Sequence, residues 1–189
     1  VYATSRNALD GFSSDRFHFK KADINDDNSL DGFLPETLDG MVYFPGSINL
    51  KPFRGLKMEH FENGLNVNFY GAVRSVKQAL KPLRKSGNAS VVMFSTVAVQ
   101  TGMAYHAGIA SAKGAVEGLT RSLAAEYAPT VRFNAIAPSL TDTKLAGQLL
   151  ANGAKAEASA NRHPLKRVGS VDDLAEMVVF LLSGKSSWI

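Results

Sequence analysis

Cysteine is absent from all 189 residues of the chain. Disulfide bonds and thiolate metal sites are therefore excluded, and we expect no metal centre. Apolar runs long enough to span a membrane, about 20 residues, are also missing. The first residues, VYATSR, show neither a basic leader nor a cleavage pattern. We therefore expect a cytoplasmic protein without membrane contact.

Dense positive charge is lacking as well. The formal net charge is +4, and the only small basic cluster consists of Lys77, Lys81, Arg84 and Lys85. This spacing is typical of a solvated helix face, whereas a nucleic-acid site would need a denser patch with interleaved aromatic residues. We expect no nucleic-acid partner. With 45% hydrophobic and 20% charged residues, residues 1–189 suit one globular domain.

The spacing of apolar residues along the chain alternates between one typical of strands and one typical of helices. It predicts strands at residues 1–5, 17–24, 38–44, 90–95 and 131–137. It predicts helices at residues 58–83, 108–127 and 171–182, and a further helical segment, rich in Ala and Gly, at 145–160. Strands that alternate with helices predict an α/β fold with a doubly wound parallel sheet covered on both faces.

Breaker-rich loops follow the predicted strands. They start at Arg6, Asp23, Gly46, Thr96 and Pro138. Ligands of open parallel sheets bind beyond the carboxyl ends of the strands. These loop starts therefore predict a ligand cleft.

The segment from Ser90 to Leu119, SVVMFSTVAVQTGMAYHAGIASAKGAVEGL, carries a family resemblance. It resembles the active-site segment of short-chain dehydrogenases/reductases, in which a Ser is followed by Tyr thirteen residues later and by Lys after four more. Lys113 is kept, whereas Thr96 stands at the serine position and Ile109 at the tyrosine position. The resemblance covers nearly the whole chain and implies a Rossmann-like, three-layer α/β/α fold that binds a nicotinamide nucleotide.

The isoleucine removes the group on which the family's chemistry depends. Carbonyl reduction needs a proton for the developing alkoxide, and the family supplies it from a phenol whose pKa a nearby lysine lowers. A Ser or Thr hydroxyl helps to hold the carbonyl oxygen. Thr96, Tyr105 or a lysine-bound water could replace the phenol. Tyr105 would lie on the lysine's stripe if the helix begins early enough; otherwise Tyr105 and His106 line the substrate mouth or pack in the loop.

The resemblance also implies cofactor contacts near the first two strands. Ser5 and Arg6 occupy the position that distinguishes the two nicotinamide nucleotides, and Arg6 favours the 2′-phosphate of NADP over NAD. The alternative is an ordinary surface arginine. Asp23 and Ile24 match the residues near the adenine ring. Asn68 matches the helix asparagine that holds a water linked to the catalytic lysine.

Two further segments match the family's cofactor site. The motif Asn-Asn-Ala-Gly after the third strand reads Tyr43-Phe44-Pro45-Gly46, so only the glycine is kept. The lost asparagines normally brace the central strands. The stretch NAIAPSLTDT follows the family's nicotinamide-binding loop, with Ser139 in place of a glycine. The implied cofactor residues of this loop are Pro138, Ser139, Thr141 and Thr143.

The family's Gly-x-x-x-Gly-x-Gly phosphate loop does not occur in the chain. We expect about 30 further residues before Val1, with a strand and a Gly-rich turn that opens a helix. That strand would lie between the first and third predicted strands. A last strand is expected after Ile189.

Two functions are consistent with these residues. The first is an NADP(H)-dependent oxidoreductase that acts on a small carbonyl or alcohol substrate. The second is a catalytically impaired NADP-binding sensor or partner subunit. A homo-tetramer or dimer is expected in either case, because the predicted helices carry small or apolar residues on more than one face, among them Ala112, Ala115, Leu119 and Leu123.

Overall fold

A computed structural model describes residues 1–8, 14–147 and 149–189. Strands β1 (Tyr2–Ser5) and β2 (His18–Lys21) pair in parallel and form a small sheet. Strands β3 (Gly40–Tyr43), β4 (Ala89–Phe94) and β5 (Val131–Ile136) form a second parallel sheet in that order. All five predicted strands are therefore present, each within about four residues of its expected ends.

The helices follow the predicted order with two differences. The described helices are α1 (Met58–Leu65), η2 (Asn66–Tyr70), α2 (Gly71–Ser86), α3 (Ala98–Thr101), α4 (Ala107–Tyr127), α5 (Gly153–Arg162) and α6 (Val171–Leu182), with short 3-10 turns η1 (Phe53–Gly55), η3 (Lys144–Ala146) and η4 (Gly184–Ser186). The helix expected over residues 58–83 is present, and it contains the π-helical turn η2 between α1 and α2, which the apolar pattern did not predict. The helical segment expected at 145–160 begins only at Gly153, where the Asn152 side chain accepts from the Lys155 amide.

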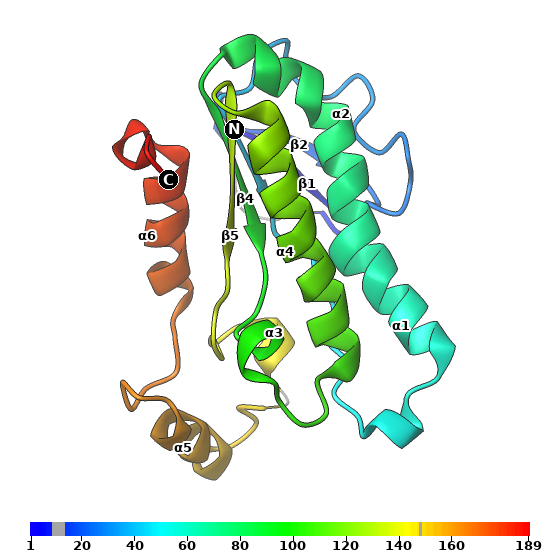
Figure 1. The fold of residues 1–189 in the computed structure, drawn as a ribbon, viewed down its shortest axis with the longest axis vertical. Helices are drawn as coiled ribbons and strands as arrows, with labels where there is room; N and C mark the ends of the chain where they lie inside the picture. The colour runs from blue at the N-terminus through cyan, green and yellow to red at the C-terminus, as the bar shows by residue number, and fades with distance from the viewer. Residues whose placement is uncertain (9–13, 148) are drawn as a thin grey trace.

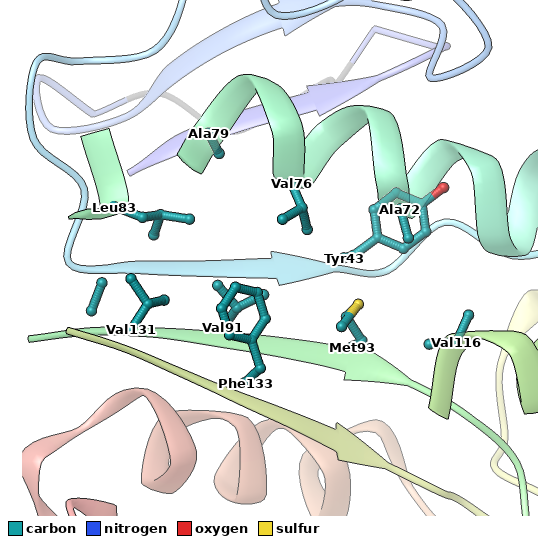
Figure 2. Packing of buried hydrophobic residues seen from close by; sticks show 11 residues of the cluster. Tyr43, Ala72, Val76, Ala79, Leu83, Val91, Met93, Val116, Val131 and Phe133 are labelled. Atoms are coloured by element: carbon teal, nitrogen blue, oxygen red, sulfur yellow. The ribbon is translucent and has the colours of Figure 1, made fainter. Parts of the chain in front are cut away.

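Helices cover both faces of the larger sheet, as predicted. In Figure 1, α2 and α4 lie on one side of β4 and β5, and α6 lies on the other. Figure 2 shows the side chains between the sheet and the first of these layers, which include Tyr43, Val76, Leu83, Val91 and Phe133. On the opposite face, Val92 packs against Val178 and Leu181 of α6. Neighbouring residues of β4 point to opposite faces, so its apolar run is buried on both sides.

The two sheets are not hydrogen-bonded to each other within the described part of the chain. β1 pairs only with β2, and β3 pairs only with β4. The second helix, α2, holds the segment between β2 and β3 through polar contacts. Gln78 accepts from the Leu30 amide at 2.8 Å, and Arg74 and Lys85 pair with Asp27 and Glu36.

None of the helices built from the described residues is both long enough and apolar enough to cross a bilayer.

Candidate active site

Lys113 projects from the second turn of α4 and is 8% exposed. Its Nζ makes no hydrogen bond or ion pair with any residue that the structure describes. Burial lowers the pKa of this ammonium from 10.5 to about 8. A largely buried cation without a protein partner is stabilised by a ligand that completes its environment. Lys113 is therefore the strongest candidate for contact with a bound molecule.

Gly46 and Asn68 lie beside this ammonium. A Cβ atom on Gly46 would stand 3.9 Å from Lys113 Nζ and 3.3 Å from Asn68 Oδ1. Any larger residue at position 46 would therefore narrow the space between the two groups. The absence of a side chain leaves the backbone after β3 close to both of them.

Asn68 is fully buried in the π-helical turn, where it holds the loop after Gly46. Its Nδ2 donates to the carbonyl oxygens of Gly64 at 2.9 Å and of Ser47 at 3.2 Å. Its Oδ1 accepts from the Ser47 amide at 3.4 Å. Asparagine is a poor former of regular helix, and wide π turns are frequent at functional sites. The amide is thus used to fix the backbone next to Lys113.

Tyr43 supports the same turn from the end of β3. Its hydroxyl donates to the Val67 carbonyl at 2.6 Å, and the ring is 3% exposed. Burial raises the pKa of this phenol, and the nearby Arg74 opposes the shift. A Cβ atom on Gly71 would collide with the Tyr43 hydroxyl, so glycine is required there. The sequence showed only that an asparagine was lost at position 43; the new brace was not foreseen.

Removing the Tyr43 hydroxyl should loosen this turn. We expect Tyr43→Phe to lower the free energy of unfolding by about 1 kcal/mol or slightly more, because the Val67 carbonyl loses a buried donor. Urea unfolding measures the change. The matched control is Tyr70→Phe, since Tyr70 is 46% exposed and its hydroxyl has no hydrogen-bond partner among the described residues. Equal effects of the two substitutions would contradict the bracing role.

Ile109 lies one helical turn before Lys113 and is 9% exposed. It lines a cavity of about 220 Å³ together with Ser47, His60, Asn63 and Asn68. The residue at the family's tyrosine position therefore faces a partly polar space next to Asn68. It closes one wall of that space with an aliphatic side chain that cannot exchange a proton.

Thr96 follows β4 and is half-buried, with its Oγ1 accepting from the Ala98 amide at 3.3 Å. The adjacent Val97 amide donates to the Pro138 carbonyl at 3.2 Å, which joins the loops after β4 and β5. The hydroxyl of Ser95, the residue before Thr96, donates to Glu117 of α4 at 2.7 Å. Sequence reasoning missed Glu117, although its place one turn after Lys113 was a usable signal.

Tyr105 lies outside α4, which begins at Ala107. Its backbone has a left-handed φ of 68°, and the residue is 60% exposed. The condition for placing Tyr105 on the lysine's stripe, an early helix start, is not met. His106 is the N-cap residue, and its Nδ1 lies 2.7 Å from the Ala104 carbonyl.

The remaining candidate cofactor residues follow the strands as expected. Ser5 ends β1, and Arg6 is exposed. Asp23 accepts from the Asn25 amide at 2.9 Å, while Ile24 packs against the central core.

The loop after β5 is held by its own polar groups. Thr141 bridges to Gly169 and donates to the Ser139 carbonyl, and Thr143 accepts from the Ala146 amide. The structure thus groups Gly46, Asn68, Ile109 and Lys113 at one place, and links Thr96 to the Pro138 loop. No contact ties Ser5 or Arg6 to that group among the residues described.

A family model described as enoyl-(acyl carrier protein) reductase matches residues 14–189. The chain belongs to the short-chain dehydrogenase/reductase family. Its curated relatives within this family include two proteins of Xanthobacter autotrophicus. Inactive 2-(S)-hydroxypropyl-CoM dehydrogenase 2 is 32% identical over 157 residues, which cover 80% of this chain and 68% of the relative. 2-(S)-hydroxypropyl-CoM dehydrogenase 3 is 32% identical over 158 residues, which cover 81% of this chain and 62% of the relative.

The fold of this short-chain dehydrogenase/reductase also matches solved structures. A ligand-free aldohexose dehydrogenase from Thermoplasma acidophilum superposes with a TM-score of 0.89 at 23% identity, covering 100% of this chain and 78% of that one. The predicted Rossmann-like fold is thereby confirmed. Overall identity does not separate active from inactive members, because one of the two Xanthobacter relatives is named inactive and both are equally similar.

The site of this short-chain dehydrogenase/reductase fits the sugar part of a nicotinamide nucleotide. Lys113 offers a buried ammonium that has no partner in the described chain, and Gly46 lets the backbone come close to it. Hydroxyl oxygens are suitable acceptors for that ammonium.

Proposed function

We propose that the protein is an NADP(H)-dependent oxidoreductase that interconverts a small carbonyl compound and its alcohol. The single observation that carries the proposal is the largely buried ammonium of Lys113, which has no partner among the described residues and lies beside Gly46, next to the fixed Asn68. Membership of the short-chain family supports it. The nicotinamide, when bound, supplies or accepts the hydride.

Each residue of the candidate site has a proposed role. Lys113 donates to ribose hydroxyls, and Asn68 keeps the Gly46–Ser47 backbone in place beside it. Thr96 offers a hydroxyl that holds the substrate oxygen. The loop from Pro138 to Thr143 lies next to Thr96 through the Val97–Pro138 hydrogen bond and is assigned to the carboxamide.

Proton delivery must differ from that of a tyrosine-containing member. Ile109 lines the cavity but has no proton to give. The ammonium of Lys113, whose pKa lies near 8, can release a proton near neutral pH through a bound water. Thr96 is the other hydroxyl proposed for this step. Tyr105 is a weaker candidate, because it lies before α4 and is largely exposed.

The test combines turnover with binding. NADPH oxidation is followed against a panel of small aldehydes and ketones, and NADPH binding is titrated directly on the same preparation. We expect binding together with measurable turnover, and loss of both in Lys113→Met. Failure to bind NADPH would refute the proposed function outright.

Ile109 also favours a second candidate, a catalytically impaired NADP-binding sensor or partner subunit. Its aliphatic side chain occupies the position of the family's acid, so the nucleotide site can persist without efficient proton transfer. NADPH binding without turnover of any carbonyl in the panel would favour this candidate over the enzyme.

Arg6 predicts a preference for NADP over NAD. Its guanidinium is exposed after β1 and has no hydrogen-bond or ion-pair partner among the described residues, so it is free to pair with a 2′-phosphate. Charge-assisted hydrogen bonds of about 1.5–3 kcal/mol correspond to roughly tenfold or more in affinity. Calorimetric titration of both nucleotides measures the ratio, and Arg6→Ala should abolish it. Equal affinities in the unmodified protein would identify Arg6 as an ordinary surface residue.

We also propose a homo-tetramer or dimer. Ala112 is buried, whereas Ala115, Leu119 and Leu123 stay partly exposed, the two leucines while packing against the core of the same chain. Met58 and Tyr70 remain exposed by 70% and 46% at the adjoining helices α1 and η2. Light scattering at micromolar concentration should give a mass of two or four chains, and Met58→Glu should reduce it. A monomer at that concentration would contradict the proposal.

A further inference from the structure

The amine of Lys113 combines two features that rarely occur together. It is 8% exposed, and no acceptor among the residues that the structure describes bonds to it. Most buried lysines are paired with a carboxylate, which keeps them protonated and unreactive. Lys113 lacks such a partner, so its nitrogen is open to chemistry as well as to hydrogen bonding.

The described groups around Lys113 include no carboxylate that would stabilise its protonated form. Asn68 and Ser47, from η2 and the loop after β3, are neutral and bond to each other. The nearest acidic residue along α4, Glu117, accepts from Ser95 and pairs with Arg121 at 3.5 Å. Burial is the only cause of the lowered pKa of Lys113, and no carboxylate contributes to it. Near neutral pH, a larger fraction of this amine is therefore neutral and nucleophilic than at an ordinary lysine.

A cavity large enough for a small reactant lies near Lys113, although Lys113 is not itself one of its lining residues. The cavity of about 220 Å³ is lined by Ile109, one turn before Lys113, and by Asn68. A Cβ atom at Gly46 would lie 3.3 Å from Asn68 Oδ1 and 3.9 Å from Lys113 Nζ, so the amine is near this part of the lining. An aliphatic wall at residue 109 leaves no phenol to hydrogen-bond the amine. The polar lining of Ser47, Asn63 and Asn68 suits a carbonyl oxygen.

We propose that Lys113 is a nucleophile that condenses reversibly with small, unhindered aldehydes and ketones. The Nζ lone pair forms a bond to the carbonyl carbon, and the C=O π electrons move to the oxygen. A proton passes from the nitrogen to that oxygen and gives a carbinolamine. Loss of water then forms the imine, with no electrons gained or lost. The inference does not rest on hydride transfer, so a protein without reductase activity still tests it.

Reductive trapping tests the inference. Nucleotide-free protein is incubated with a limiting amount of butanal and sodium cyanoborohydride between pH 6 and pH 9, and N-butyl lysines are quantified by peptide mass spectrometry. Lys77 and Lys155, both exposed on helices, are the internal references. Nucleotide is omitted because Lys113 is also its proposed contact.

Lys113 should be labelled at least tenfold faster than the references at pH 7. About one amine in ten is neutral at pH 7 with a pKa near 8, against about one in 2,500 for an ordinary lysine, and burial reduces this advantage. The rate at Lys113 should level off above pH 8, while the reference rates keep rising. Labelling no faster than the references, or a rate that keeps rising through pH 9, would overturn the inference.

Two variants distinguish the contribution of the Lys113 amine from that of the cavity near it. In Lys113→Arg, the single adduct that forms first at pH 7 should disappear, while slow labelling of the other lysines continues. In Ile109→Phe, the larger ring should fill the cavity and slow labelling of Lys113 several-fold, with no change at Lys77 or Lys155. Persistence of the first adduct in Lys113→Arg, or unchanged Lys113 labelling in Ile109→Phe, would overturn it.

Discussion

Ile109→Tyr is expected to create or strongly raise NADPH-dependent carbonyl reductase activity. The new phenol would lie one helical turn from Lys113, and the positive charge of that lysine would favour the phenolate. The cavity beside Ile109 leaves room for the larger ring. Thr96 is the hydroxyl proposed to hold the substrate oxygen. General acid catalysis contributes about 10²–10⁴-fold, so steady-state NADPH oxidation should show the gain directly.

The matched control for this gain is Ile109→Phe, which adds the ring without the hydroxyl. Only the tyrosine variant should gain activity if proton donation is what the chain lacks. A brisk wild-type rate that Ile109→Tyr slows would mean that another donor is at work. Tyr105→Phe would then be measured, and an unchanged rate would eliminate Tyr105 as that donor.

Arg132→Ala is expected to give the largest loss of stability. Arg132 lies on β5, and its guanidinium closes the end of α6 and the turn that follows it. It donates to the carbonyl oxygens of Leu181, Ser183, Ser186 and Ile189 at 2.9 to 3.3 Å. These include carbonyls that the last turn of a helix leaves without partners. Truncation would remove the charged donor from all four carbonyl oxygens at once, although each of them keeps another, neutral donor.

The expected cost is about 3 kcal/mol, because hydrogen bonds to charged groups are stronger than neutral ones and several of them are lost together. In a chain of this length that corresponds to a fall in Tm of roughly 6–12 °C, which calorimetry resolves. Arg121→Ala is the matched control, since its exposed ion pair with Glu117 contributes at most about 1 kcal/mol. A shift for Arg132→Ala as small as that of the control would refute the closing role.

Local signals along the chain were sufficient to predict most of the fold. The limits of α6 follow from Ser170 and Asp173, whose side chains cap its first turn, and the observed helix spans the predicted residues. The π turn could not be predicted in this way. Phe61, Leu65, Phe69 and Val73 keep a helical spacing through it, so the apolar pattern does not reveal the wider turn.

The site was predictable to the extent that its residues match a linear motif. Lys113, Asn68 and Gly46 were named from such matches, and the structure brings them together. The brace from Tyr43 to Val67 joins residues far apart in sequence, and no local pattern predicts it. The lack of an acidic partner for Lys113 among the described residues likewise depends on side chains from several elements, so no local pattern predicts it. The nucleotide preference assigned to Arg6 stays a prediction.

The π-helical turn at Asn66–Tyr70 has a consequence for how the chain tolerates changes in length. A π turn accommodates one more residue than an α-helical turn, so it amounts to a single-residue insertion inside one long helix. Deleting one residue there would let α1 and α2 fuse into a continuous rod with both apolar faces still in phase. The shortened protein would keep a continuous helix but lose the hydrogen bond from Tyr43 to Val67 and turn Asn68 away from Ser47. A change of one residue in length at this turn would therefore remove the site while leaving the helix in place.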